Sequence, residues 1–249
     1  MYASNSASQW GSPTAPRKAL LIHALATDSS TWEGIAQLLV AEGFFVVAPN
    51  LLGHAWRRGT DFRMSTLAED LRPYFINDTS YDVVVGSSLG GTVALSLLPF
   101  LPKTKQVTVI LLDPPLEWET TAEMERSQVL ETIANVKNMQ EVADEFGWSR
   151  RDCVLAALSV SKCDRTTIDG IFSHNRPWSF SGLLENIPPH VKVTVLAGDP
   201  EAGAICLPEH VPRDIERLNV RVLPGVGHII QMERPDAIMD AIQLPRAKL

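Results

Sequence analysis

The strongest constraint on the fold is an alternation of short, continuous apolar runs with segments of helical periodicity. Each apolar run has the length and the uninterrupted hydrophobicity of a strand that is buried on both faces of a sheet. The runs occupy residues 19–22, 44–48, 82–85 and 107–112. The helical segments between them occupy residues 32–41, 65–75 and 88–100. This alternation predicts an α/β fold with a mostly parallel sheet and helices on both faces.

The alternation stops after residue 113 and resumes near residue 190. Residues 114–189 contain no convincing strand, and their helical stretches are 119–136, 139–146, 150–159 and 165–172. Beyond them, we expect strands at 191–197 and 220–223 and helices at 208–218 and 235–242. The chain thus divides into a flexible tail (1–17), an α/β core (18–113 and 190–249) and an insertion (114–189).

Composition narrows the functional classes. The net charge of −7, with no basic cluster, argues against a nucleic-acid partner. No apolar run reaches the ~18 residues of a membrane span, and the N-terminal residues lack a signal-peptide pattern. Three cysteines without CxxC spacing favour reduced thiols and a cytoplasmic protein. Neither metal-ligand spacing nor a phosphate loop is present, so we expect no metal and no cofactor. A small-molecule substrate is the expected partner, and a homodimer is left open.

Residues 83–95 carry the strongest chemical signal. A buried strand runs into GSSLG at 86–90 and then into a helix. G-x-S-x-G in this context is typical of a nucleophile elbow, in which small residues let the chain turn sharply enough to project a serine hydroxyl. The helix N-terminus behind the serine favours developing negative charge. Ser88 is therefore the candidate nucleophile.

Together with three further segments, this elbow resembles the α/β-hydrolase superfamily, and the likeness runs over residues 18–242. LIHAL at 21–25 is similar to the strand and His-Gly element of that family, and APNLLGHA at 48–55 to its Pro-Asp-x-x-Gly-His-Gly turn. VGSSLGG at 85–91 is similar to Val-Gly-His-Ser-x-Gly-Gly, and LPGVGH at 223–228 to the terminal strand and histidine loop. The resemblance implies the α/β-hydrolase fold, with the insertion as a helical cap over Ser88.

The resemblance also assigns roles to individual residues. His228 lies in the histidine loop, and a serine hydroxyl needs a neighbouring base with a pKa near neutrality. Backbone N–H groups of Leu25 and Leu89 match the positions of the oxyanion hole. We expect structural roles for two other histidines. His23 lies in the oxyanion-loop motif, and His54 follows a turn glycine, where its ring could hydrogen-bond neighbouring loops.

The acid of a Ser-acid-His triad has more than one candidate. Asp113 directly follows the strand after the nucleophile helix, and Asp199 follows the next strand of the core. The usual Gly-x-x-Asp form of the later site would instead favour Glu201. The segment 199–205, however, is similar to the haloalkane-dehalogenase-like branch, which carries its acid at the earlier strand, although its nucleophile is not serine. We therefore favour Asp113, with Asp199 as the alternative and Glu201 third.

Four positions depart from the family pattern. Ala24 and Ala55 replace glycines, Asn50 replaces an aspartate, and Ser87 replaces the histidine before the nucleophile. Alanine at position 24 requires an ordinary backbone angle there or costs some strain. None of these changes removes a triad group, but they argue against carrying over a substrate from any named subfamily.

The expected function is a serine hydrolase that cleaves a small, largely apolar ester, lactone or related carbonyl compound through an acyl-enzyme. Trp118, Trp148 and Trp178 are candidates for shaping the pocket, with packing inside the cap as their alternative role. Other functions remain open on the same triad, since a fold does not fix a reaction. They are a lyase, a C–C bond hydrolase, a cofactor-free haloperoxidase, a slow small-molecule receptor and a structural protein that has lost activity.

Overall fold

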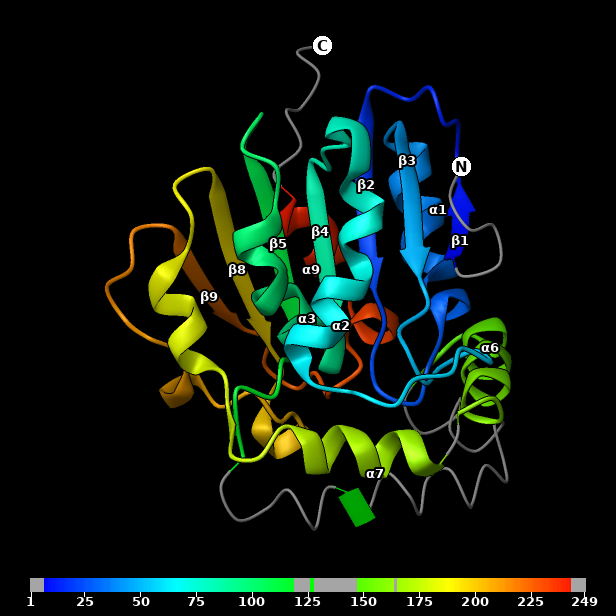
Figure 1. The fold of residues 1–249 in the computed structure, drawn as a ribbon, viewed down its shortest axis with the longest axis vertical. Helices are drawn as coiled ribbons and strands as arrows, with labels where there is room; N and C mark the ends of the chain where they lie inside the picture. The colour runs from blue at the N-terminus through cyan, green and yellow to red at the C-terminus, as the bar shows by residue number, and fades with distance from the viewer. Residues whose placement is uncertain (1–6, 119–125, 128–146, 164, 243–249) are drawn as a thin grey trace.

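A seven-stranded sheet forms the centre of the computed structural model, which describes residues 7–118, 126–127, 147–163 and 165–242. The strand order is β1-β3-β2-β4-β5-β8-β9 (Figure 1). β1 pairs antiparallel with β3, and the other pairings in this sheet are parallel. The strands are β1 (Ala7–Trp10), β2 (Arg17–Ile22), β3 (Phe44–Pro49), β4 (Val83–Ser87), β5 (Val107–Leu112), β8 (Val191–Ala197) and β9 (Leu218–Val222).

Helices cover both faces of this sheet because its central strands are apolar on both sides. Leu20 and Ile22 pack in one core with α2 and α3, whereas Ala19 and Leu21 pack in a second core with α1, α8 and α9. Burying each leucine or isoleucine side chain of these cores contributes ~1.5–3 kcal/mol. The predicted α/β class, a mostly parallel sheet with helices on both faces, is confirmed. The helices are α1 (Glu33–Ala41), α2 (Met64–Leu71), α3 (Leu89–Leu97), α8 (Ile230–Glu233) and α9 (Pro235–Ala241).

Residues 7–17 differ from the flexible tail that the sequence predicted for residues 1–17. Ala7–Trp10 forms β1 along the outer edge of β3, and β2 already begins at Arg17. The Trp10 indole N–H donates to Glu33 Oε2 at 2.7 Å, which fastens β1 to α1. Edge strands gain their backbone hydrogen bonds from a neighbour and need no continuous apolar run, so the sequence pattern gave no sign of β1.

The insertion contains α6 (Arg150–Val160) and α7 (Arg165–His174); α7 lies across the carboxyl ends of the strands, and α6 lies to one side of it (Figure 1). It also contains two short strands that the sequence did not predict, β6 (Glu117–Trp118) and β7 (Trp178–Ser179), which pair antiparallel. Strands of two residues are too short to show a period. The helices predicted at 119–136 and 139–146 fall outside the described residues, apart from Arg126 and Ser127.

Side chains of α7 and of the residue after it anchor the insertion to the loop after β3. Asn175 accepts from the Met64 N–H at 2.8 Å and donates to the Phe62 carbonyl at 2.9 Å. The Thr167 hydroxyl donates to the Gly53 carbonyl at 3.1 Å. α7 is thus fixed to the core by polar contacts that are largely buried.

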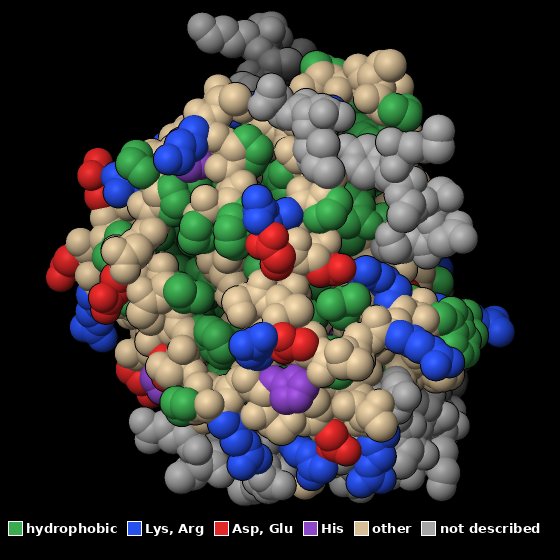
Figure 2. Space-filling view, in the orientation of Figure 1, with side chains coloured by type: hydrophobic (Ala, Val, Ile, Leu, Met, Phe, Trp, Pro, Cys, Tyr) green, Lys and Arg blue, Asp and Glu red, His purple; other side chains and the backbone are tan. Residues whose placement is uncertain are grey.

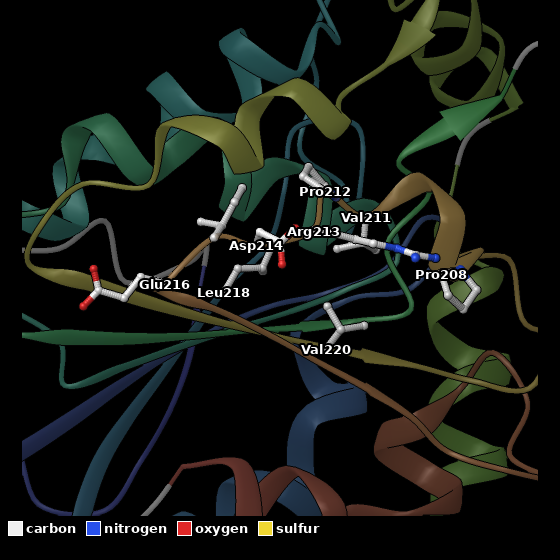
Figure 3. Close-up of a pocket in the computed structure, with 9 residues that line it drawn as sticks. Pro208, Val211, Pro212, Arg213, Asp214, Glu216, Leu218 and Val220 are labelled. Carbon is white, nitrogen blue, oxygen red and sulfur yellow. The ribbon is translucent and has the colours of Figure 1, made fainter.

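The helix predicted at 208–218 is wrong. A 3₁₀ turn, Pro208–His210, is followed by an irregular segment that contains Pro212 and leads into β9. Proline in that position opposes a continuous helix. An open surface depression lies between residues 208–216 and β9, at the sheet edge (Figure 3). The remaining 3₁₀ helices are η1 (Ser29–Trp32), η2 (Arg72–Asp78), η3 (Leu98–Phe100), η4 (Ser181–Asn186) and η5 (Pro200–Ala202).

The surface offers two further observations. Charged side chains of both signs are interspersed on the face seen in Figure 2. Within the described residues, every helix falls short of the length and apolarity that crossing a bilayer requires.

Candidate active site

Ser88 occupies the turn between β4 and α3. Its backbone angles are φ 50° and ψ −120°, a conformation that costs a non-glycine residue ~1–3 kcal/mol. The turn is held by a hydrogen bond from the Ser88 N–H to the Leu112 carbonyl at 2.8 Å and by another from the Gly91 N–H to the Ser88 carbonyl at 2.8 Å. The side chain is therefore carried on a strained, well-anchored elbow of the kind that the sequence predicted.

The glycines of the elbow are explained by close backbone approaches. A Cβ on Gly86 would lie 2.3 Å from the Gly90 carbonyl oxygen. A Cβ on Gly90 would lie 2.2 Å from the Ile22 carbonyl oxygen and 2.5 Å from that of His23. Backbone atoms cannot move aside as a flexible side chain can, so any larger residue at these positions would displace β2 or α3.

Asp113 lies at the end of β5 with its carboxylate completely buried. Its Oδ2 is 2.6 Å from His228 Nδ1. The same carboxylate accepts backbone N–H bonds from Gly198 (3.1 Å), Ile205 (2.8 Å) and Cys206 (3.1 Å). Hydrogen bonds of this kind fix the orientation of a carboxylate, and Asp113 in turn orients the His228 ring.

The other two acid candidates do not meet His228. Asp199 accepts from the N–H of Gly225 at 2.8 Å and from the N–H of Glu201 at 3.0 Å. These backbone bonds, chiefly the one from Gly225, hold the pKa of Asp199 below its usual value. Glu201 itself is exposed on η5. Asp199 therefore joins the loop after β8 to the histidine loop, which is the loop-fixing role common for an aspartate before proline.

His228 follows β9, in a loop whose own anchors are visible. The Gly227 N–H donates to Glu233 Oε2 at 2.7 Å, which closes the loop onto α8. The ring of His228 is 25% exposed, and its Nδ1 side faces Asp113. Ser88, Asp113 and His228 thus all follow strands of the parallel part of the sheet, at the edge where the carboxyl ends lie. Ligands of open α/β sheets bind at that edge.

The proposed oxyanion donors sit on two different elements. Leu89 is the first residue of α3, so its N–H has no partner within the helix. Leu25 lies in the loop after β2, and its N–H takes part in no hydrogen bond with another described residue. The non-glycine residues with positive φ in the loops after β2 and β3 are Ala26 (59°), Ala55 (48°) and Trp56 (68°), so Ala24 keeps an ordinary backbone.

His23 and His54 hold the loop that carries Leu25. His23 Nε2 accepts from the Leu51 N–H at 3.0 Å, and His54 Nε2 accepts from the Ala26 N–H at 3.2 Å. Burial lowers the pKa of His23 to about 4 and that of His54 to about 3, so both rings are neutral near pH 7. The structural role expected for both histidines is what their contacts support. The sequence motifs did not reveal that His54 secures the residue next to Leu25.

An ion pair that the sequence did not reveal connects the insertion to the same loop. Lys162, two residues beyond the end of α6, pairs with Asp28. The Asp28 side chain is almost completely buried, and burial alone would raise its pKa. Hydrogen bonds from Lys162 and Ser30 outweigh that effect and hold the pKa below its usual value.

The three tryptophans proposed to line a pocket have different surroundings. Trp118 stacks on Phe172 with ring centroids 5.5 Å apart and contacts Trp178 at 4.7 Å. Trp178 is buried, and its indole N–H donates to the Pro115 carbonyl at 2.8 Å. Trp178 therefore belongs to the larger hydrophobic core, which the insertion shares with the sheet, α2 and α3, and Trp118 packs against that core while half-buried. Trp148 precedes α6 and lies outside both core clusters of the described residues.

The side chains that could bind a metal ion are dispersed in the part of the chain that the structure describes. There, His, Cys, Asp and Glu side chains do not gather in groups of three or more that could hold an ion.

Comparisons with known proteins agree with this architecture. An esterase from Exiguobacterium antarcticum superposes with a TM-score of 0.75 over 96% of this chain and 95% of that one, at 15% identity. The N-acyl homoserine lactone degrading enzyme Est816 superposes with a TM-score of 0.71 over 94% and 93%, at 16% identity. Likeness at these identities establishes the fold alone.

Sequence comparison supplies the family. The uncharacterized protein Rv2715 of Mycobacterium tuberculosis is 36% identical over 87 residues, which are 34% of this chain and 25% of that protein. The match thus spans about a quarter of the length of this curated relative. The model of the alpha/beta hydrolase family, in contrast, matches residues 19–241, nearly the whole described chain. The chain belongs to the alpha/beta hydrolase family.

Proposed function

We propose that this chain is a serine hydrolase that cleaves a small, largely apolar ester, lactone or related carbonyl compound through an acyl-enzyme intermediate. The observation that carries the proposal is the 2.6 Å contact between His228 Nδ1 and the buried carboxylate of Asp113. A buried carboxylate on Nδ1 selects the tautomer whose Nε2 can accept a proton, and it stabilises the imidazolium that results. Ser88, on its elbow, is the hydroxyl that this base would serve.

The proposed reaction has two halves. Ser88 Oγ attacks the acyl carbon while His228 Nε2 takes the hydroxyl proton, and the N–H groups of Leu25 and Leu89 stabilise the oxyanion. His228 then gives the proton to the leaving oxygen, and the acyl group stays on Ser88. In the second half, His228 takes a proton from water, the hydroxide attacks the acyl-enzyme, and the carboxylic acid leaves as Ser88 regains its proton.

Three considerations support the proposed reaction and its substrate class. Esters and lactones both present the acyl carbon that this mechanism requires, and the structural neighbours include an esterase and an N-acyl homoserine lactone degrading enzyme. The N-terminus of α3 adds a favourable electrostatic contribution of ~0.3–1 kcal/mol to an oxyanion beside it. The apolar character of the pocket is inferred from the aromatic residues of the insertion, of which Trp118 stays partly exposed.

Labelling with a fluorophosphonate tests the proposal. The wild type should be labelled, and Ser88→Ala should not. Asp113→Asn should lose up to about 10⁴-fold in kcat for a short-chain ester, because the carboxylate no longer selects the tautomer of His228. Asp199→Asn is the matched control and should lose far less.

Three results would count against the proposal. Persistent labelling of Ser88→Ala would refute the nucleophile. A greater loss in Asp199→Asn than in Asp113→Asn would refute the acid. A labelled wild type that turns over neither esters nor lactones would refute the reaction class and direct attention to a lyase or a receptor on the same residues.

A further inference from the structure

A buried hydrogen bond joins the strand of the nucleophile to the helix after the histidine loop. The Ser87 hydroxyl donates to Gln231 Oε1 at 3.0 Å, across 144 positions of sequence. Ser87 is the last residue of β4 and has no exposed surface, and Gln231 is 8% exposed. The family pattern carries a histidine at the position of Ser87, so a hydrogen bond from a serine hydroxyl at this position departs from that pattern.

The position of this bond matters because the strands that precede Ser88, Asp113 and His228 are not all neighbours in the sheet. In the sheet, β5 and β8 separate β4 from β9, so the histidine loop must reach back across two strands toward Ser88. The contact with Asp113 fixes the Nδ1 side of His228, but it does not tie the loop to the nucleophile elbow itself. Gln231 lies three residues after His228 and Ser87 lies next to Ser88, so their hydrogen bond makes that connection.

We propose that Ser87 and Gln231 are positioning residues that set the placement of His228 relative to Ser88. The inference rests on the proposed serine-hydrolase function. Removal of either partner leaves the other buried without its hydrogen bond, which is unfavourable and allows the loop to shift. Displacements of about 1 Å at a reacting pair can reduce a rate by about 10²-fold. Ser87 has no exposed surface and Gln231 has little, so the loss should appear in kcat and not in KM.

The experiment compares Ser87→Ala, Gln231→Ala and the double variant with the wild type. Ser96→Ala is the matched control, since it removes one hydroxyl of α3 that donates to the Thr92 carbonyl and lies away from the histidine loop. The measurements are the second-order rate constant of fluorophosphonate labelling and the kcat and KM for a short-chain ester. They are made well below the melting temperature of each variant.

Each single variant should label about tenfold more slowly, lose kcat by a similar factor and keep KM within about twofold. The double variant should be no slower than the slower single variant, because both changes remove the same bond. Ser96→Ala should match the wild type. Labelling of both single variants at the wild-type rate, or losses that multiply in the double variant, would overturn the inference. An unlabelled wild type would instead overturn the proposed function on which it rests.

Discussion

Acid should destabilise this protein through the two buried histidines that hold the loop of Leu25. His23 and His54 are completely buried, with ring centroids 4.9 Å apart, and each Nε2 accepts a backbone N–H. Burial lowers their pKa values from 6.5 to about 4 and about 3, respectively. In the folded protein both rings therefore stay neutral at about pH 5, whereas in the unfolded chain both are mostly protonated.

The direction and size of the effect follow from the difference in bound protons. Between the folded pKa and 6.5 the unfolded state binds more protons, so the free energy of unfolding falls as the pH falls through that window. At about pH 5 each histidine has crossed about 1.5 units, and about 1.36 kcal/mol per unit gives ~2 kcal/mol each, or ~4 kcal/mol together. Carboxylates, whose unfolded pKa values lie near 4, add only ~0.1 kcal/mol each at that pH.

Urea unfolding followed by tryptophan fluorescence, at about pH 7.5 and about pH 5, measures this loss. The wild type should lose ~4 kcal/mol of unfolding free energy between the two conditions. His54→Gln keeps an acceptor for the Ala26 N–H but does not protonate, so its loss should fall to ~2 kcal/mol. His210→Gln changes a histidine outside this pair and should keep the loss of the wild type.

Two outcomes would refute the reasoning. A wild type whose unfolding free energy changes by less than ~1 kcal/mol between the two conditions would show that the folded state tolerates protonation of His23 and His54. A His54→Gln variant that retains the full loss would show that the acid sensitivity arises elsewhere in the chain.

Two further pairs of substitutions test how the elbow and the loop are held. Gly90→Ala should cost at least ~1–3 kcal/mol and most of the activity, because its Cβ would meet the Ile22 carbonyl oxygen at 2.2 Å. Gly182→Ala, whose Cβ would have no neighbour within 4 Å, should stay within ~0.5 kcal/mol in the same thermal or urea assay. Lys162→Met should cost ~1–3 kcal/mol by removing the cation beside buried Asp28, and Lys162→Arg should recover most of that loss; equal stability of the two variants would contradict the role of the charge.

The nucleophile elbow could be predicted because its signals are local. An apolar strand, small residues around Ser88 and a following helix all lie within about a dozen consecutive positions, and the steric need for Gly86 and Gly90 is visible in the motif. The acid could not be chosen by the same means. Asp113 and Asp199 both follow apolar strands and both precede proline. What distinguishes the two carboxylates is the direction in which the backbone N–H groups of residues 198–206 point. That direction depends on the conformation of a loop, and a loop has no periodic sequence pattern.

Elements at the sheet margin escaped prediction for a related reason. β1 gains its stability from pairing with β3, and its own four residues are only partly buried. The bonds of His54 to Ala26 and of Gln231 to Ser87 likewise connect positions that only the folded sheet brings together. A pattern read along the chain reports which face of an element is apolar, but it cannot report which distant polar group completes a buried hydrogen bond.

Backbone strain is concentrated at the edge of the sheet that carries the proposed chemistry. Among the described residues, six non-glycine positions have positive φ, and five of them lie in loops after the carboxyl ends of β2, β3, β4 and β5. Three of the five are Ala26, beside Leu25, together with Ser88 and Asp113. Each such residue costs ~1–3 kcal/mol, a large share of the ~5–15 kcal/mol that stabilises a typical domain. Glycine would relieve the strain at Ser88 and Asp113, but it would delete the hydroxyl and the carboxylate that the proposed reaction requires. The proposed reaction therefore explains why strain is retained at Ser88 and Asp113, and at Asp113 the carboxylate is also needed to accept the backbone N–H groups of Gly198, Ile205 and Cys206.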